Sequence, residues 1–154
     1  MKAISIIIVT CNSDRYIESC LSSILAQVID DCEIILIDNG SKDNTISIIK
    51  AKYPDIILIE NPENFGPCYA RNQGINKAIG EFILCLDHDV KLLSNFLTNI
   101  YKAIESEQTI GAVGAKILMR DAKTIYSAGI YPTYLLRFHD IGDQEIDLAK
   151  FEEK

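Results

Sequence analysis

Four short apolar segments constrain the fold of this chain more than any other feature of its sequence. Each is rich in β-branched residues and almost uninterrupted by polar ones. Parallel strands that are buried on both faces show this pattern, whereas strands with one solvated face alternate apolar and polar residues. We therefore predict four buried parallel strands, at residues 4–9, 33–37, 55–59 and 81–86.

The segments between these strands have apolar residues spaced by three and four, which is the spacing of one helix face. Pro54 ends the second such segment, and Pro67 suits the first turn of the third. Alternating strands and helices favour right-handed crossovers, and therefore an α/β fold with a mainly parallel, Rossmann-like sheet covered by helices on both faces. The predicted helices cover residues 16–25, 43–53, 66–80 and 93–104.

The pattern changes after residue 110. Residues 112–118 and 125–130 look like further strands with no helix between them. Residues 138–154 are acidic and weakly periodic, which is typical of a loop or a frayed helix. We expect residues 1–120 to form an α/β domain and residues 121–154 to begin a second, partly irregular region.

The composition argues against several classes of protein. Lys and Arg total 15 against 22 for Asp and Glu, and the net charge of −7 disfavours a nucleic acid partner, whose phosphates bind clustered cations. No apolar stretch approaches the ~18 residues of a membrane-spanning helix, so we expect a soluble protein. The five cysteines are scattered and form no C-x-x-C pair, which favours reduced thiols in the cytoplasm over a disulfide framework or a zinc site.

Three of the predicted strands end in a carboxylate, namely Asp38, Glu60 and Asp87. Ligands of open parallel sheets bind outside the carboxyl ends of the strands, so these acids point to a site at that edge. Taken one at a time, each acid is equally consistent with a strand end that emerges into water.

The segment Asp87-His88-Asp89 is more informative than a single acid. In an extended segment, residues two apart face the same way, so the two carboxylates can converge while His88 points elsewhere. Paired carboxylates suit a hard divalent cation such as Mn²⁺ or Mg²⁺, which can bridge to a diphosphate. A bare D-x-D also occurs by chance in solvated turns, and this one lacks the glycine and closing glutamate of an EF-hand.

Two loops add polar groups at the same edge. Asp38 opens a turn of six residues that suits contact with a base or a ribose, and that equally suits an ordinary turn with a helix cap. Gly66 permits close approach to the start of a helix, and Arg71 lies one turn into that helix. Arg71 can meet a phosphate or pair with a strand-end acid, and the pairing is the more common fate of a lone arginine.

In this order, the segments resemble the inverting glycosyltransferases of family 2. The resemblance covers roughly residues 3–120, and four ordered motifs at the family's usual spacing are more specific than any one of them. It implies a nucleotide-diphospho-sugar transferase fold of the GT-A type. The motifs are Ser5-Ile-Ile-Ile-Val-Thr-Cys-Asn12, Asp38-Asn-Gly-Ser-Lys-Asp-Asn-Thr45, Asn61-Pro-Glu-Asn-Phe-Gly66 with Ala70-Arg-Asn-Gln-Gly74, and Leu86-Asp-His-Asp-Val90.

The resemblance also implies site residues. Asp38 would recognise the base, Arg71 would lie near the base or the diphosphate, and Asp87 would lie near the ribose. The chain departs from the family at Cys11, where an aromatic residue is common, which puts base stacking in doubt. The residues implied at the nucleotide-sugar pocket are Thr10, Cys11, Asn12, Asp38, Gly66, Arg71 and Asp87.

The metal implied by the resemblance is Mn²⁺ or Mg²⁺, held by Asp89 together with Asp87. His88 stands where a small residue or proline is common, and this change removes no metal ligand. From the residues alone, a structural or solvent-facing role for His88 is the more common one.

The family's reaction is a single displacement. A carboxylate deprotonates an acceptor hydroxyl, which attacks the anomeric carbon with inversion while the nucleotide diphosphate departs. In family members this base lies well beyond the D-x-D, and the late acids here look like the loop that precedes it, so we identify no catalytic residue. We expect a domain truncated at its acceptor side, with the late acids at Asp140, Asp143, Glu145 and Asp147.

The resemblance suggests a UDP- or dTDP-linked donor and an unknown glycan or lipid-linked acceptor, in polysaccharide or glycoconjugate synthesis. The segment Leu86–Val90 makes rhamnosyltransferase-like relatives plausible. The expected location is the cytoplasm or the inner face of the membrane. An incomplete domain would expose apolar surface, and self-association into a homo-oligomer would cover it.

Three other functions compete with a transferase. A degenerate module would bind the nucleotide sugar without transferring it. A phospho-receiver domain would explain the acids at Asp38 and Asp87, but it needs an acidic pair after the first strand, where Thr10-Cys-Asn12 stands. A dinucleotide-dependent oxidoreductase is disfavoured because no G-x-G-x-x-G follows the first strand.

Overall fold

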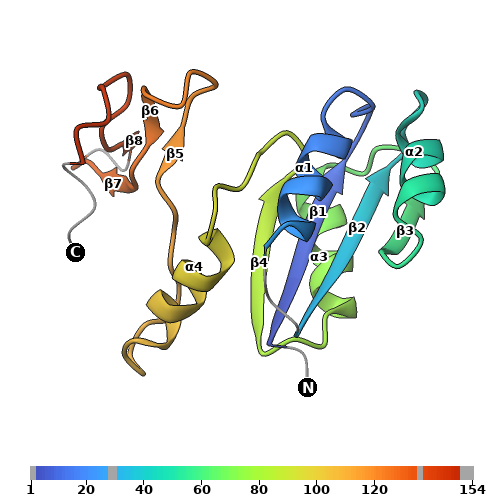
Figure 1. The fold of residues 1–154 in the computed structure, drawn as a ribbon, viewed down its shortest axis with the longest axis horizontal. Helices are drawn as coiled ribbons and strands as arrows, with labels where there is room; N and C mark the ends of the chain where they lie inside the picture. Colours follow the sequence, from blue (N-terminus) through green and yellow to red (C-terminus); the bar gives the residue numbers. More distant parts are fainter. Residues whose placement is uncertain (1–2, 28–30, 135–136, 150–154) are drawn as a thin grey trace. The chain divides into compact units, whose positions relative to one another are not determined.

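The computed structural model describes residues 3–27, 31–134 and 137–149. The chain divides into two compact units, residues 1–98 and 99–154, and each is described by itself (Figure 1). The expected boundary at residue 120, which separates parts by function, stays a prediction.

The first unit contains a four-stranded parallel sheet whose order is β3-β2-β1-β4. Figure 1 shows α1 in front of this sheet and α3 behind it, so both faces carry a helix and the predicted α/β architecture is confirmed. The elements are β1 (Ile4–Thr10), α1 (Ile17–Leu25), β2 (Cys32–Asn39), α2 (Thr45–Lys52), β3 (Ile57–Asn61), α3 (Pro67–Lys77) and β4 (Phe82–Asp87).

The two central strands, β1 and β2, supply a large part of the core, because their apolar runs are covered on both faces. The prediction that all four strands are buried on both faces is wrong for β3 and β4. These two lie at the ends of the strand order, and their side chains are mostly half-buried or exposed. The largest fully buried side chains of the central strands are Ile6, Ile7, Ile8, Ile35, Leu36 and Ile37.

Helix α3 lies unusually close to the sheet because a glycine faces it. A Cβ atom built on Gly74 would lie 2.6 Å from Cγ2 of Ile7 and 2.8 Å from Cδ1 of Ile37. The neighbouring Ala70 packs in the same cluster of buried side chains. Small residues on the inner face of α3 therefore set how near the start of this helix comes to the ends of the strands.

The helix predicted over residues 66–80 ends before Gly80, which has a role in the following connection. Helix α3 ends at Lys77, and Ala78 follows in an extended conformation. A Cβ atom on Gly80 would lie 2.6 Å from the backbone nitrogen of Ser5, so this glycine allows the α3–β4 connection to cross the amino ends of the strands closely. The N–H of Gly80 donates to the hydroxyl of Ser5, which donates in turn to Glu33.

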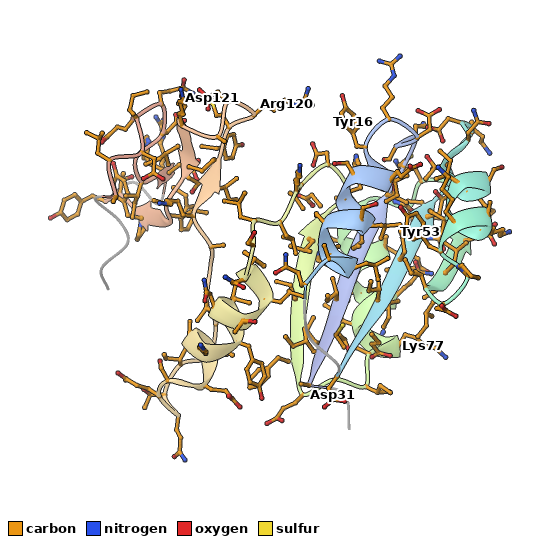
Figure 2. All side chains as sticks on the ribbon, viewed as in Figure 1. Tyr16, Asp31, Tyr53, Lys77, Arg120 and Asp121 are labelled. Carbon is orange, nitrogen blue, oxygen red and sulfur yellow. The ribbon has the colours of Figure 1, made fainter. Side chains whose placement is uncertain are left out.

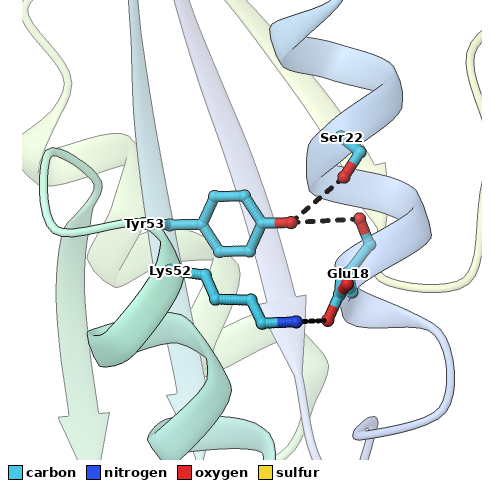
Figure 3. Close-up of polar contacts among 4 residues, drawn as sticks. All are labelled: Glu18, Ser22, Lys52 and Tyr53. Carbon is cyan, nitrogen blue, oxygen red and sulfur yellow. Dashed lines mark hydrogen bonds and ion pairs between the residues drawn. The ribbon is translucent and has the colours of Figure 1, made fainter.

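Polar side chains on the surface of the first unit tie α1 to α2 (Figure 3). The hydroxyl of Tyr53 lies 3.1 Å from that of Ser22 and donates to the carbonyl of Glu18. The ammonium of Lys52 lies 2.6 Å from the carboxylate of Glu18. These contacts are exposed, so they fix the packing of two helices at little energetic gain.

The second unit contains two small antiparallel pairs. Strand β5 (Ile117–Leu118) pairs with β6 (Ile125–Ser127), and β7 (Ile130–Pro132) pairs with β8 (Phe138–Asp140). The expected strands at 112–118 and 125–130 are therefore shorter and interrupted. The prediction of a loop or frayed helix after residue 138 is wrong at its start, because β8 lies there, and residues 150–154 lie outside the described residues.

A single acid organises the turn between β5 and β6. The carboxylate of Asp121, labelled in Figure 2, accepts hydrogen bonds from the hydroxyl and N–H of Thr124 and from the N–H of Lys123. These bonds lower the pKa of Asp121 to about 2. Helix α4 (Phe96–Glu105) begins at the end of the first unit, where Leu97 is buried.

Candidate functional site at the carboxyl ends of the strands

The carboxyl ends of the four strands lie at one edge of the first unit. Figure 2 places Tyr16, which precedes α1, at this edge, and Asp31 at the opposite, amino edge. The predicted residues from Thr10 to Asp89 are all at or just beyond the carboxyl ends of β1, β2 and β4, or at the start of α3. The fold therefore gathers the predicted site residues at one edge of one sheet.

Asp38 is fully buried within β2, one residue before the strand ends. Its two carboxylate oxygens accept from Ser41, one from the N–H at 2.9 Å and one from the hydroxyl at 2.5 Å. The hydroxyl of Ser41 also accepts from the N–H of Asn12. Asp38 therefore shapes the β2 exit loop, and Ser41, which sequence reasoning missed, links that loop to the one after β1.

The loops after β1 and β2 are joined by further bonds. The side-chain oxygen of Asn12, whose φ is 53°, accepts from the N–H of Lys42. The carboxylate of Asp43 accepts from the N–H of Asp14 and from Thr45. Burial works against ionisation of Asp43, but these hydrogen bonds outweigh it and keep its pKa below the ordinary value. The two loops thus form one cross-linked rim.

Thr10 closes β1 with an unsatisfied hydroxyl. Its side chain is 1% exposed, and among the described residues its Oγ1 is the one buried side-chain polar atom without a hydrogen-bond partner. Buried hydroxyls normally have a partner, because an unmade hydrogen bond is costly. The orphaned oxygen at this edge marks a place where a bound molecule can supply the missing bond.

A network of side-chain amides fixes the loop between β3 and α3. Asn39 is 2% exposed, donates to Asn64 and Gly66, and accepts from the side chain of Asn61 and the N–H of Phe65. Beyond this centre, the amides of Asn61 and Gln73 bond to each other in both directions. This network, which sequence reasoning missed, holds Gly66, whose φ of 86° precedes the first turn of α3.

Arg71 pairs with the acid at the end of β4. Its Nη2 lies 3.3 Å from Oδ1 of Asp87, and the side chains are 35% and 70% exposed. Both charges influence the thiol of Cys85, two residues earlier on the same strand. Burial raises the pKa of Cys85, the positive charge of Arg71 opposes that rise, and the negative charge of Asp87 adds to it. Of the two fates predicted for Arg71, the structure shows the pairing with a strand-end acid.

The two strand-end aspartates face opposite sides of the sheet. Thr10 is paired with Asp38 in the register of β1 and β2, whereas Val9 is paired with Asp87 in that of β1 and β4. Because successive residues of a strand point to opposite faces, Asp38 and Asp87 do not share a face. Sequence reasoning placed both acids at one edge but could not assign their faces.

The D-x-D segment is only partly extended. Strand β4 ends at Asp87, and His88 and Asp89 lie in a turn. Nδ1 of His88 lies 3.2 Å from the carbonyl of Val9, which favours the structural role expected for it. The carboxylate of Asp89 contributes, after burial, to raising the pKa of the buried Cys20 thiol of α1 to about 12. The charge of Asp89 therefore influences Cys20 of α1, whereas Asp87 forms an ion pair with Arg71 of α3.

Two other acids have ion-pair partners of their own. Glu60 lies one residue before the end of β3, as Asp38 does in β2, but it forms a surface ion pair of 2.8 Å with Lys50 of α2. In the second unit, Asp147 pairs with Lys116 at 2.7 Å, which lowers the pKa of Asp147. Glu60 thus drops out of the candidate site, and Asp147 is engaged in an ion pair of its own unit.

The described residues were compared with the requirements of a metal centre and of a membrane-spanning helix. Among them, no three His, Cys, Asp or Glu side chains gather closely enough to hold a metal ion. No helix in the described part of the chain is both long and apolar enough to cross a membrane. None of the five cysteines, all in described positions, forms a disulfide.

Comparisons with known proteins agree on one family. The model of the family described as glycosyl transferase family 2 matches residues 5–149. The poly-beta-1,6-N-acetyl-D-glucosamine synthase of Staphylococcus aureus is 32% identical over 127 residues, which cover 81% of this chain and 31% of that protein.

Two solved structures show the same fold. The mannosyltransferase PcManGT from Pyrobaculum calidifontis, solved with GDP-Man and Mn²⁺, matches with a TM-score of 0.69 and 28% identity over 75% of this chain and 35% of its own. S. aureus TarS matches with a TM-score of 0.64 and 25% identity over 80% of this chain and 41% of its own. The chain thus spans about a third of the length of the curated relative and less than half of each structure.

Proposed function

The chain belongs to glycosyltransferase family 2, and we propose that its carboxyl edge binds a nucleotide-diphospho-sugar as the donor of a glycosyl transfer. The observation that carries this proposal is the cluster at the end of β4, where Arg71 of α3 meets Asp87 and Asp89 follows in the adjoining turn. Exposed carboxylates beside a half-buried guanidinium offer both a cation site and a phosphate contact.

The nucleotide would lie along the cross-linked rim of the β1 and β2 exit loops. Thr10 has a buried hydroxyl that lacks a partner, and Asn12 is exposed beside it. Asp38 is buried, and its carboxylate oxygens accept hydrogen bonds from Ser41. We propose that Asp38 contributes to base recognition by fixing the β2 exit loop and by accepting a further hydrogen bond from the base. Cys11 and Gly66 would complete the pocket.

The donor set fits a divalent cation in part. Asp87 and Asp89 are exposed carboxylates, the ligands that Mn²⁺ and Mg²⁺ prefer, and oxygens of a diphosphate would supply further ligands. Such a cation, when bound, supplies charge neutralisation for the departing nucleoside diphosphate. The chain's own contribution is to hold Asp87 beside Arg71, so that one edge carries both contacts to the diphosphate.

We further propose transfer with inversion to a glycan or lipid-linked acceptor, from a UDP- or dTDP-linked sugar, in polysaccharide or glycoconjugate synthesis in the cytoplasm or at the inner face of the membrane. The ligands present in the structures of the neighbours, UDP-GlcNAc and UDP for TarS and GDP-Man with Mn²⁺ for PcManGT, support a nucleotide-sugar donor of this general kind. The base that would accept the proton of the acceptor is not assigned.

Calorimetric titration of UDP and dTDP, with and without Mn²⁺, tests the donor site. We expect binding that Mn²⁺ strengthens in the wild type and that Asp89→Asn weakens. Asp89 is the sharper target, because removing the charge of Asp87 would also release Arg71. Asp55→Asn is the matched control, because Asp55 is an exposed acid that precedes β3, at the amino end of the strand.

The proposal would be refuted if the folded wild-type chain bound no nucleoside diphosphate. Release of nucleoside diphosphate from a nucleotide sugar, measured with candidate acceptors, separates the two forms of the function. Turnover supports a transferase, and binding without turnover on any acceptor supports a binding module.

A further inference from the structure

Two exposed aromatic rings lie together where α3 begins. Phe65 precedes Gly66, and Tyr69 is in the first turn of the helix. Their ring centroids are 5.2 Å apart with an interplanar angle of 60°, which is an edge-to-face pair. Phe65 is 44% exposed and Tyr69 is 54% exposed. The pair therefore presents apolar ring surface to solvent at the edge that carries the candidate site.

The backbone that carries this pair is held in place. The N–H of Phe65 donates to the buried side chain of Asn39, and the N–H of Gly66 donates to Asn64. Pro67 fixes the first turn of α3. Rings that are already ordered lose little conformational freedom when a ligand stacks on them, so a fixed exposed pair is better suited to binding than a mobile one.

Helix α3 separates two kinds of surface. Arg71 points to β4, where it meets Asp87. Gln73 points to β3, where it bonds Asn61, and Tyr69 shares the Gln73 side of the helix because the two are four residues apart. At the start of α3, Arg71 therefore faces β4, whereas the aromatic pair lies on the β3 side of the helix.

A nucleoside diphosphate has the same division, with charge at one end and a planar base at the other. We propose that Phe65 and Tyr69 form an aromatic platform that stacks on the base of the donor nucleotide, while Arg71 and the acids near β4 serve its diphosphate. The inference rests on the proposed function and adds residues that bind the base.

The position of Cys11 supports this assignment. Its sulfur accepts from the side-chain amide of Asn64, at 3.7 Å, so the β1 exit loop touches the residue next to Phe65. A thiol offers no flat ring for stacking, whereas the two rings nearby do. The base would then lie between the rim formed by the β1 and β2 exit loops and the aromatic platform.

The test compares ligands with and without a base. UDP and inorganic pyrophosphate are titrated, each with Mn²⁺, into the wild type and into Phe65→Ala, Tyr69→Ala and Tyr69→Phe. Stacking of a base on an aromatic side chain is worth about 1–3 kcal/mol, so each alanine variant should bind UDP roughly 5- to 150-fold more weakly. Tyr69→Phe keeps the ring and should bind UDP as the wild type does.

Binding of pyrophosphate should be unchanged in all variants, because it has no base. Tyr126→Ala is the matched control, since Tyr126 is also 54% exposed but lies in the second unit. Circular dichroism confirms that each variant is folded.

Alanine variants that bind UDP as tightly as the wild type would overturn the platform and leave the proposed function standing. Equal losses for UDP and pyrophosphate would also overturn it, because the rings would then support the charged site instead. Unchanged UDP binding with reduced transfer to a sugar acceptor would reassign the rings to the acceptor. Failure of the wild type to bind any nucleoside diphosphate would overturn the proposed function and the platform with it.

Discussion

Replacing Asn39 by alanine should cost the first unit about 2–4 kcal/mol of unfolding free energy. The substitution removes two donated bonds, to Asn64 at 2.8 Å and to Gly66 at 3.3 Å, and two accepted bonds, from Asn61 at 3.1 Å and from the N–H of Phe65 at 3.2 Å. A hydrogen bond contributes about 0.5–1.5 kcal/mol net, and a buried group left without a partner costs about 1–3 kcal/mol.

The exposure of the partners places the cost near the middle of the possible sum. Asn64 and Phe65 are exposed, so water can replace the bonds that they lose. Asn61 is 8% exposed, and its amide loses one of two acceptors with little access to water. One buried loss of about 1–3 kcal/mol and three partly compensated ones account for the predicted range.

Replacement by aspartate distinguishes a bonding network from simple packing. Asn39→Asp keeps the acceptor for Asn61 and Phe65, but it places a second oxygen against the oxygens of Asn64 and Gly66. The charge is also buried, so the folded state raises the pKa of the new carboxyl above its unfolded value. The variant should therefore gain stability as the pH falls through that range, because the folded state then binds the extra proton more tightly.

Urea denaturation followed by far-ultraviolet circular dichroism measures these differences, and the absence of tryptophan makes fluorescence a weak probe. The matched control is Asn76→Ala, because Asn76 is an exposed asparagine within α3. It should lie within about 0.5 kcal/mol of the wild type. An Asn39→Ala variant as stable as this control would refute the account of the network.

Gly74, Cys20 and Tyr53, three residues of the first unit, give further predictions. Gly74→Ala gains about 1 kcal/mol of helix propensity, but it forces a methyl group to within 2.6 Å of Ile7, and such overpacking costs about 1–3 kcal/mol. Thermal denaturation should therefore show a lower melting temperature for the variant. A higher melting temperature would contradict the close packing of α3 on the sheet. Cys20 has a pKa raised to about 12, so Ellman's reagent at pH 8 should label Cys68, which is exposed, and leave Cys20 unlabelled until the chain unfolds. Because the folded state holds the Cys20 proton more tightly, stability should fall as the pH rises from 9.0 towards 12, and Cys20→Ala should remove that part of the slope. Tyr53→Phe removes exposed hydrogen bonds, so the free energy of unfolding measured in urea should fall by no more than about 1 kcal/mol. A larger decrease would show that water does not replace these bonds between α1 and α2.

The sequence pattern predicts the elements of the first unit well, because their apolar residues are continuous or periodic. The four strands and three crossover helices lie within a few residues of their predicted ranges. Strand order is not predicted, since it depends on which runs pair across the chain rather than on any local signal. The apolar run of β3 reads like that of β2, yet β3 is an outer strand and only half-buried.

The candidate site shows the same limit. Asp38, Arg71 and Asp87 were predicted from strand ends and motifs, and the structure brings all three to one edge. Asn39 and Ser41, which fix the loops there, were not singled out, because an amide or a hydroxyl in a turn has no periodic signature. The strand β8 was missed because three residues, beginning at Phe138, are too few to show an alternation.

The contact between Arg71 and Asp87 decides how a diphosphate could enter the proposed site. The pair is long, at 3.3 Å, and Asp87 is 70% exposed, so it belongs to the class of surface ion pairs worth about 0–1 kcal/mol. A phosphate group can therefore take Arg71 at little cost, and that exchange frees the carboxylate of Asp87. The loop that precedes α3 is held by Asn39 through its bonds to Asn64 and Gly66, so the rearrangement can be confined to two side chains. Arg71→Ala should therefore weaken UDP binding and leave the free energy of unfolding almost unchanged. A large decrease in the free energy of unfolding would show instead that the ion pair stabilises the fold.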